Sequence, residues 1–245
     1  MAEHRFVVEG PQAVREALAA GALLELFAEP GRQDDLESAA LAQGVPVVHV
    51  SAPVLGALTD TVTPQGVVGV AGLIDVGLDV ALAGEPSLVV VLEAVADPGN
   101  AGTVLRTADA AGADAVVLTA GSVDPHNGKC VRATAGSLWH LPVVSGPDLA
   151  DVVSTLRARG LQVLATSGSG ADDLDDLADA ATLGAPTAWL LGSEAAGLSP
   201  EALALADRTV RVPLHGRAES LNLATAAAVC LYASARAQRD TARSR

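Results

Sequence analysis

Residues 87–120, "SLVVVLEAVADPGNAGTVLRTADAAGADAVVLTA", determine the fold class of this 245-residue chain. The run 87–95 is almost continuously apolar, which is typical of a strand covered on both faces in a parallel sheet. Residues 101–112 then predict a helix, and residues 113–120 predict a second strand. A strand, a helix and a strand in this order favour an α/β domain.

The same alternation continues to the C-terminus, so residues 87–245 are predicted to form one parallel sheet with helices on both sides. Further strands are expected within 131–144 and at 161–167, 186–193 and 208–214. Further helices are expected at 150–160, at 199–206 and, Ala-rich, at 221–239.

Residues 1–72 predict a second, smaller α/β unit. Pro11 suits the first turn of a helix that stops at Gly21, and residues 45–50 are β-branched, as in a strand. Residues 73–86 carry Gly, Asp and Pro without clear periodicity, and we place the linker between the two units there.

Composition limits the partners and the chemistry. Hydrophobic residues make up 50% of the chain and aromatic residues 2%, so the core must consist of Val, Leu and Ala. The formal net charge of −14 taken alone argues against a nucleic-acid partner, because phosphate binding needs a basic surface. The acidic run 170–180 is interpreted as a solvated helix face. Cys130 and Cys230 are too far apart for a metal motif and are expected to be buried.

The chain carries no sign of a membrane or export segment. Its first residues lack the apolar region of a signal peptide, and no uninterrupted apolar run reaches transmembrane length. We therefore expect a soluble, cytoplasmic protein without a membrane partner.

Polar residues gather directly after three predicted strands, where open parallel sheets bind their ligands. The three loops hold Asn100, Gly102, Arg106, Gly192, Glu194, Gly197, Ser220 and Asn222. Simpler interpretations exist for several of them. Asn100 would serve as a helix N-cap and Arg106 as an ordinary surface residue. Ser220 would cap the last helix, with Asn222 as a residue of its start. Phosphate-loop and dinucleotide glycine motifs are missing, which argues against an ATP or dinucleotide site.

These loops resemble the motifs of the SpoU, or TrmH-type, family of RNA ribose 2′-O-methyltransferases. Residues 97–118 are similar to the family's first motif, 190–203 to its second and 210–233 to its third, and 127–144 fits the segment between the first two. Residues 4–72, with "VEGPQAVREAL" and "TPQGVVGV", resemble the L30e-like substrate-binding domain of many members. The resemblance spans nearly the whole chain.

The resemblance implies a fold, a cofactor and an assembly. The α/β domain at 87–245 would contain a C-terminal trefoil knot, and S-adenosylmethionine (SAM) would be the methyl donor, with no metal required. Family members act as homodimers, and each site borrows residues across the interface. By the same resemblance, the donor would contact Thr166, Gly192, Val212 and Leu221.

The resemblance also assigns catalytic roles. Ser220 and Asn222 would orient the target ribose and the hydrogen bonds of the site, and Glu194 would brace its loop. Asn100 would belong to the same catalytic set. Arg106 would activate the 2′-hydroxyl, either as a perturbed general base or by electrostatic stabilisation of the developing alkoxide. Both roles stay open, because a guanidinium does not readily lose its proton in proteins.

An acidic methyltransferase needs its positive groups near the site. We expect Lys129, Arg132 and Arg217 to contact RNA, with Arg106 nearby and with Arg5 and Arg15 on the first unit. Structured 23S ribosomal RNA is the expected substrate and transfer RNA the second choice. The rival hypotheses are a non-catalytic RNA-binding module and an enzyme that uses another nucleotide cofactor.

Overall fold

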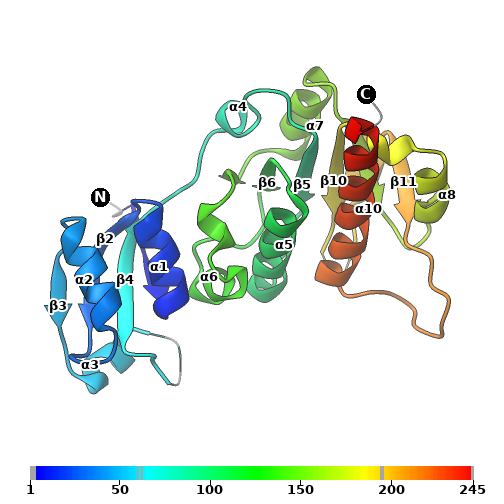
Figure 1. The fold of residues 1–245 in the computed structure, drawn as a ribbon. Coiled ribbons are helices and arrows are strands. Elements are labelled where there is room, and N and C mark those ends of the chain that lie inside the picture. The colour runs from blue at the N-terminus through cyan, green and yellow to red at the C-terminus, as the bar shows by residue number, and fades with distance from the viewer. Residues whose placement is uncertain (1–3, 60, 62, 194–195, 244–245) are drawn as a thin grey trace.

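Two β-sheets organise the chain in the computed structural model, which describes residues 4–59, 61, 63–193 and 196–243 (Figure 1). We call the part around the first sheet the N-terminal unit and the part around the second sheet the C-terminal unit. The linker between them contains a short helix, α4 (Leu78–Ala81), that the sequence did not predict.

The N-terminal unit has a four-stranded sheet in the order β1-β4-β2-β3. Its strands are β1 (Arg5–Glu9), β2 (Leu23–Ala28), β3 (Val47–His49) and β4 (Val67–Gly72). Its helices are α1 (Pro11–Ala19), α2 (Asp34–Ala42) and α3 (Ala52–Ala57). Strand β4 pairs antiparallel with β1 and β2, whereas β2 and β3 are parallel. The predicted helix start at Pro11 is confirmed, and β1 was not predicted.

The C-terminal unit has a seven-stranded sheet in the order β7-β6-β5-β10-β8-β11-β9, and every neighbouring pair is parallel. Its strands are β5 (Leu88–Leu92), β6 (Ala115–Leu118), β7 (Val143–Ser145), β8 (Gln162–Thr166), β9 (Asp172–Asp173), β10 (Thr187–Leu191) and β11 (Arg208–Arg211). Its α-helices are α5 (Pro98–Ala111), α6 (Gly128–Thr134), α7 (Leu149–Ala158), α8 (Leu174–Asp179), α9 (Pro200–Leu205) and α10 (Leu223–Arg243), and its 3₁₀ helices are η1 (Ser137–Trp139) and η2 (Thr182–Gly184). The predicted parallel α/β sheet is confirmed, while the trefoil knot stays a prediction.

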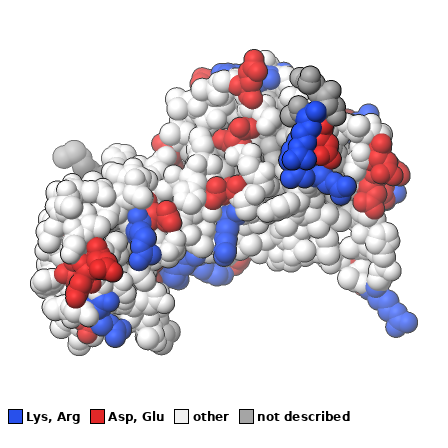
Figure 2. All heavy atoms as spheres, in the orientation of Figure 1, with Lys and Arg blue, Asp and Glu red and all other residues white. Residues whose placement is uncertain are grey.

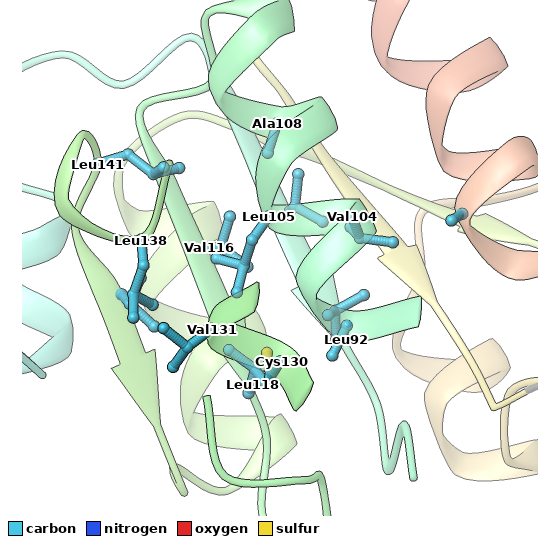
Figure 3. Packing of buried hydrophobic residues seen from close by; sticks show 14 of the residues in the cluster. Leu92, Val104, Leu105, Ala108, Val116, Leu118, Cys130, Val131, Leu138 and Leu141 are labelled. Atoms are coloured by element: carbon cyan, nitrogen blue, oxygen red, sulfur yellow. The ribbon is translucent and has the colours of Figure 1, made fainter. Parts of the chain in front are cut away.

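Strand β5 shows why a continuous apolar run is needed at the centre of this sheet. Leu88, Val90 and Leu92 pack into one hydrophobic cluster, together with residues of α5, α6 and α10. Val89 and Val91 point to the opposite face and pack into a second cluster with α7 and α9. Figure 3 shows part of the first cluster, in which α5 and α6 cover β5 and β6. Helices therefore cover both faces of the sheet.

The two cysteines belong to this core. Cys130 and Cys230 are both fully buried, and burial raises the pKa of each thiol to about 12. A thiol with so high a pKa is a poor nucleophile, because only the thiolate reacts readily. The predicted role of both residues as small buried hydrophobes is confirmed.

The N-terminal unit packs directly against the C-terminal unit. Phe6 on β1 is 9% exposed, and its ring centroid lies 4.6 Å from that of His126 and 6.3 Å from that of Trp139. Buried residues of the N-terminal sheet thereby join the larger hydrophobic cluster. Within the described residues, no helix has the length and apolar character needed to cross a membrane.

Candidate active site

Three loops meet at the carboxyl ends of β8, β10 and β11, because these parallel strands are neighbours in the sheet. Thr166 is the last residue of β8, and its hydroxyl donates to the carbonyl of Leu190 at 3.2 Å. Gly192 directly follows β10, and Val212 directly follows β11. Three of the four predicted donor-binding residues thus lie at one edge of the sheet, as loops after parallel strands should.

The loop after β10 folds back so tightly that its first position requires glycine. A Cβ atom on Gly192 would lie 2.3 Å from the carbonyl carbon and oxygen of Gly197. Ser193 and Gly197 form an isolated antiparallel bridge that closes the turn. Gly170, after β8, has a similar constraint, since its Cβ would lie 2.5 Å from the carbonyl carbon of Val210. Backbone therefore lines this edge of the sheet, which suits a ligand held mainly by backbone groups.

Glu93, which the sequence analysis did not single out, positions the loop after β10 from the neighbouring strand. It follows β5, and its Oε1 accepts a hydrogen bond from the Ser199 hydroxyl at 2.5 Å while its Oε2 accepts from the Ser199 backbone N–H at 3.0 Å. Ser199 in turn caps α9 by accepting from the N–H of Ala202. The signal in the sequence was a single acid at the end of an apolar run.

The first turn of α5 carries a connected set of polar groups. Asp97, not Asn100, is the N-cap, and it accepts a hydrogen bond from the Asn100 backbone N–H at 2.8 Å. Lys129 Nζ lies 2.6 Å from the other Asp97 carboxylate oxygen. The Lys129 hydrogen bond, with further help from the Asn100 N–H, lowers the pKa of Asp97. Because Asp97 serves as the cap, the Asn100 side chain is available for a contact with a residue far away in the sequence.

That contact joins the first predicted motif to the third. Asn222 donates a hydrogen bond from Nδ2 to Oδ1 of Asn100 at 3.0 Å. Its own Oδ1 accepts from the backbone N–H groups of Ala224 and Thr225, so Asn222 caps α10. The alternative interpretation of Ser220 as the cap is therefore wrong. Two helix N-termini, which both favour negative charge, meet at this pair.

The segment between β11 and α10 loops away from the rest of the C-terminal unit between its two ends, Val212 and Asn222 (Figure 1). Arg217 and Ser220 are exposed on this segment, and Leu221 is half-buried near its end. Neither Arg217 nor Ser220 therefore lies in an enclosed cleft of a single protomer. Glu194, the remaining predicted site residue, lies outside the described residues.

Arg106 lies on α5 but does not face the Asn100–Asn222 pair. Its side chain is exposed. Arg106 lies six positions after Asn100, and at about 100° per residue this places the two side chains about 120° apart around the helix. Within one protomer the two predicted catalytic residues therefore point in different directions.

Two residues of the predicted basic patch pair with acids. Lys129 pairs with Asp97, and Arg132 pairs with Glu9, whose carboxylate oxygen lies 2.8 Å from Nη1. On the face shown in Figure 2, Lys and Arg side chains are interspersed with Asp and Glu. RNA contacts by these residues stay a prediction, and Arg132 is the residue most fully committed to another partner.

The loop arrangement is matched by known families. Residues 87–232 match the SpoU rRNA methylase family, and residues 1–69 match the MRM3-like substrate binding domain. The chain belongs to the SpoU rRNA methylase family. The resemblance seen in the sequence is thereby confirmed, and so is the prediction that the chain is a SAM-dependent RNA methyltransferase.

Relatives of this SpoU-family chain cover both of its units. The 23S rRNA (guanosine(2553)-2′-O)-methyltransferase RlmP of Bacillus subtilis is 36% identical over 230 residues, which are 93% of this chain and 87% of the relative. A SAM-bound rRNA methyltransferase from Sinorhizobium meliloti is 34% identical with a TM-score of 0.82, over 95% of this chain and 87% of that one. The SpoU methyltransferase AviRb from Streptomyces viridochromogenes, also SAM-bound, is 29% identical with a TM-score of 0.85, over 97% and 92%.

Proposed function

We propose that this protein transfers a methyl group from SAM to the ribose 2′-hydroxyl of one nucleotide in 23S ribosomal RNA. The observation that carries the proposal is the hydrogen bond between Asn222 and Asn100, which brings the first and third motifs together beside the loops after β8, β10 and β11. Relatives that cover most of the chain are named as 23S rRNA 2′-O-methyltransferases, which supports ribosomal RNA over transfer RNA.

We assign donor binding to Thr166, Gly192, Val212 and Leu221. When bound, SAM supplies an activated methyl group on a sulfonium, so the reaction needs no metal for electrophilic activation. The protein's task is to hold the ribose oxygen in line with that methyl group and to keep water away, and positioning alone lowers such barriers by several kcal/mol. The close approach of Gly192 to the backbone of Gly197 restricts the backbone at this edge of the sheet.

We assign the ribose to the polar groups around the Asn100–Asn222 pair, with Ser220 close by in sequence and with Glu194 bracing the loop after β10. The amides donate and accept hydrogen bonds, which suits the hydroxyl groups of a ribose. The positive ends of α5 and α10 stabilise negative charge as the 2′-hydroxyl loses its proton. Arg106 then takes the proton as a perturbed base or stabilises the alkoxide from a short distance.

We propose that the enzyme acts as a homodimer whose partner supplies the second half of each site. Arg106 faces away from Asn100 on the same helix, so Arg106 of one protomer would serve the pair in the other. Helix α10 carries the apolar side chains of Val229 and Tyr232, which are 40% and 53% exposed. Large exposed apolar groups on a helix that borders the site are suited to a subunit interface.

We propose that residues 1–72 form the RNA-selecting domain, residues 73–86 the linker and residues 87–245 the methyltransferase domain. Arg217, on the projecting segment, and Lys129, which is 57% exposed, are the best placed of the predicted RNA contacts. A cytoplasmic location would bring the enzyme to ribosomal RNA.

Isothermal titration of the protein with SAM tests this proposal against its rivals. We expect one donor site per protomer, with S-adenosylhomocysteine competing and ATP not competing. An RNA-binding module without chemistry would bind RNA but not SAM, and an enzyme for another nucleotide would bind that nucleotide instead.

A further inference from the structure

An ion pair between a buried carboxylate and a half-buried guanidinium connects the N-terminal and C-terminal units. Glu9 ends β1 and its side chain is 6% exposed, while Arg132 lies on α6 with a side chain that is 34% exposed. The Glu9 Oε2 atom lies 2.8 Å from Arg132 Nη1 and also accepts a hydrogen bond from the Thr61 hydroxyl. A buried carboxylate needs such partners, because removal of one of them leaves a charge without compensation.

Apolar packing does not fill the junction at this point. Glu9 and Arg132 line a cavity of about 250 Å³, together with polar residues such as Gln12 and Gln65 and apolar residues such as Ala13, Val67 and Ala135. The apolar contacts of Phe6 with His126 and Trp139 involve other residues of the junction. Beside the cavity, the Glu9–Arg132 ion pair therefore joins the two units, while Glu16 of α1 and His140 of the C-terminal unit form a second charged contact elsewhere in the junction.

Arg132 is also rigidly connected to the candidate site. Helix α6 packs so closely on α5 that a Cβ atom on Gly102 would lie 2.4 Å from the carbonyl oxygen of Cys130. One turn before Arg132, Lys129 binds the N-cap Asp97, which holds the first turn of α5 and Asn100. A shift of Glu9 relative to α6 would therefore move the N-terminal unit relative to the Asn100–Asn222 pair.

We propose that Glu9 and Arg132 are a positioning pair, which holds the N-terminal unit in the orientation that delivers RNA to the methyl-transfer site. This inference rests on the proposed function, with the N-terminal unit as the RNA-selecting domain. Neither residue is a catalytic residue, because each acts through the placement of other groups. Arg132 is thereby assigned a partner within the protein instead of an RNA phosphate.

The two roles of Arg132 predict different kinetics. A positioning pair sets the orientation of bound RNA, so its loss should lower kcat by about tenfold or more while the Kd for RNA changes by less than about threefold. A phosphate contact sets affinity, so its loss should raise Kd, reduce the salt dependence of binding by about one unit of slope, and leave kcat at saturating RNA unchanged.

The experiment compares five variants of the protein. Glu9→Gln and Arg132→Gln each break the ion pair, and the double variant removes both charges at once. Arg132→Lys keeps the charge, and Glu25→Gln on β2 is the matched control that removes a carboxylate elsewhere in the same sheet. A positioning pair predicts that the double variant is no worse than either single variant, because the partners act as a unit.

A distance measurement reports the relative orientation of the two units in the absence of RNA. Nitroxide labels at Ser38→Cys on α2 and Ser154→Cys on α7, both exposed, report the separation of the units by pulsed electron resonance, and the native cysteines are too buried to react. We expect a narrow distance distribution in the labelled protein without further changes, and also in its Arg132→Lys and Glu25→Gln variants. We expect a broad distribution in Glu9→Gln and Arg132→Gln.

An unchanged narrow distribution in Glu9→Gln would overturn the proposal, as would a kcat that Glu9→Gln leaves intact while Arg132→Gln weakens RNA binding. If the protein with its native ion pair binds SAM but methylates no RNA, the proposed function is contradicted instead. The label distances would still decide whether the ion pair holds the two units together.

Discussion

The side chain of Asn222 caps helix α10 and at the same time donates a 3.0 Å hydrogen bond to Asn100, which lies 122 residues earlier in the chain. One amide thus serves two purposes. Its oxygen stabilises the start of a helix, and its nitrogen fixes the distance between two motifs of the candidate site.

Substitution at Asn222 should separate these two purposes. Asn222→Ala should lower the free energy of unfolding by about 1 kcal/mol through loss of the cap, and should lower methylation by about a hundredfold. Asn222→Ser keeps an oxygen that can cap the helix but does not reach Asn100. We therefore expect urea unfolding of Asn222→Ser to match that of the unmodified protein while its methylation rate stays low. Full activity in Asn222→Ser would show that the Asn100 contact is dispensable.

The sequence predicted this region well at the level of motifs and less well at the level of individual bonds. Strands, helix starts and the three loops follow from local patterns, because apolar runs and Pro or Gly positions act over a few residues. Partners do not. In the sequence "ADPGN", Asp97 and Asn100 compete for the cap, and only the structure shows that Asp97 wins.

Contacts between distant segments were beyond the reach of local patterns. Glu9 and Arg132 are 123 positions apart, so the neutralisation of Arg132 had no local signal, and a count of basic residues overestimated the free positive charge. Glu93 was overlooked for the same reason, since its partner Ser199 lies 106 positions later.

The tight turn after β10 predicts a sharp difference between two glycines. Gly192→Ala would place a methyl group 2.3 Å from the backbone of Gly197, so the turn must open and SAM affinity should fall by about tenfold or more. Gly168→Ala is the matched control, because no atom lies within 4 Å of its added Cβ. Calorimetric titration with SAM measures the affinity of both variants for the donor. Equal affinity in the two variants would exclude the Gly192 turn from the donor site.

Glu93 should support the same loop from β5. Glu93→Ala leaves the Ser199 hydroxyl and N–H without their acceptor, which should cost about 1–3 kcal/mol of unfolding free energy and weaken SAM binding. Glu201→Ala removes an exposed acid from the first turn of α9 and should change the unfolding free energy by less than about 0.5 kcal/mol. Chemical denaturation compares the two variants. Equal losses would show that Glu93 acts only as a surface charge.

The stability of the protein should respond to pH through His140, whose side chain contacts Asp109 in its own unit and Glu16 in the N-terminal unit. The hydrogen bond to Asp109, at 2.7 Å, and the contact with Glu16 on α1 raise the pKa of His140 above its ordinary value of 6.5. A raised pKa means that the stabilisation is fully present below about pH 6.5 and is lost as the pH rises through the folded-state pKa.

Thermal unfolding of the unmodified protein and His140→Gln measures this effect. Because His140 is exposed to solvent, we expect a difference in Tm of no more than about 3 °C near pH 6, and less near pH 9. A difference that stays constant over this range would show that protonation of His140 does not contribute to the stability of the protein.

The most direct test of the central claim is transfer of labelled methyl from SAM to unmodified 23S ribosomal RNA, with transfer RNA in parallel and Arg106→Ala as the control. Nuclease digestion then identifies the labelled nucleotide. The proposed function predicts label in a single 2′-O-methyl nucleotide of 23S ribosomal RNA, and loss of that label in Arg106→Ala. Label on a base instead of a ribose, or equal labelling by Arg106→Ala, would contradict it.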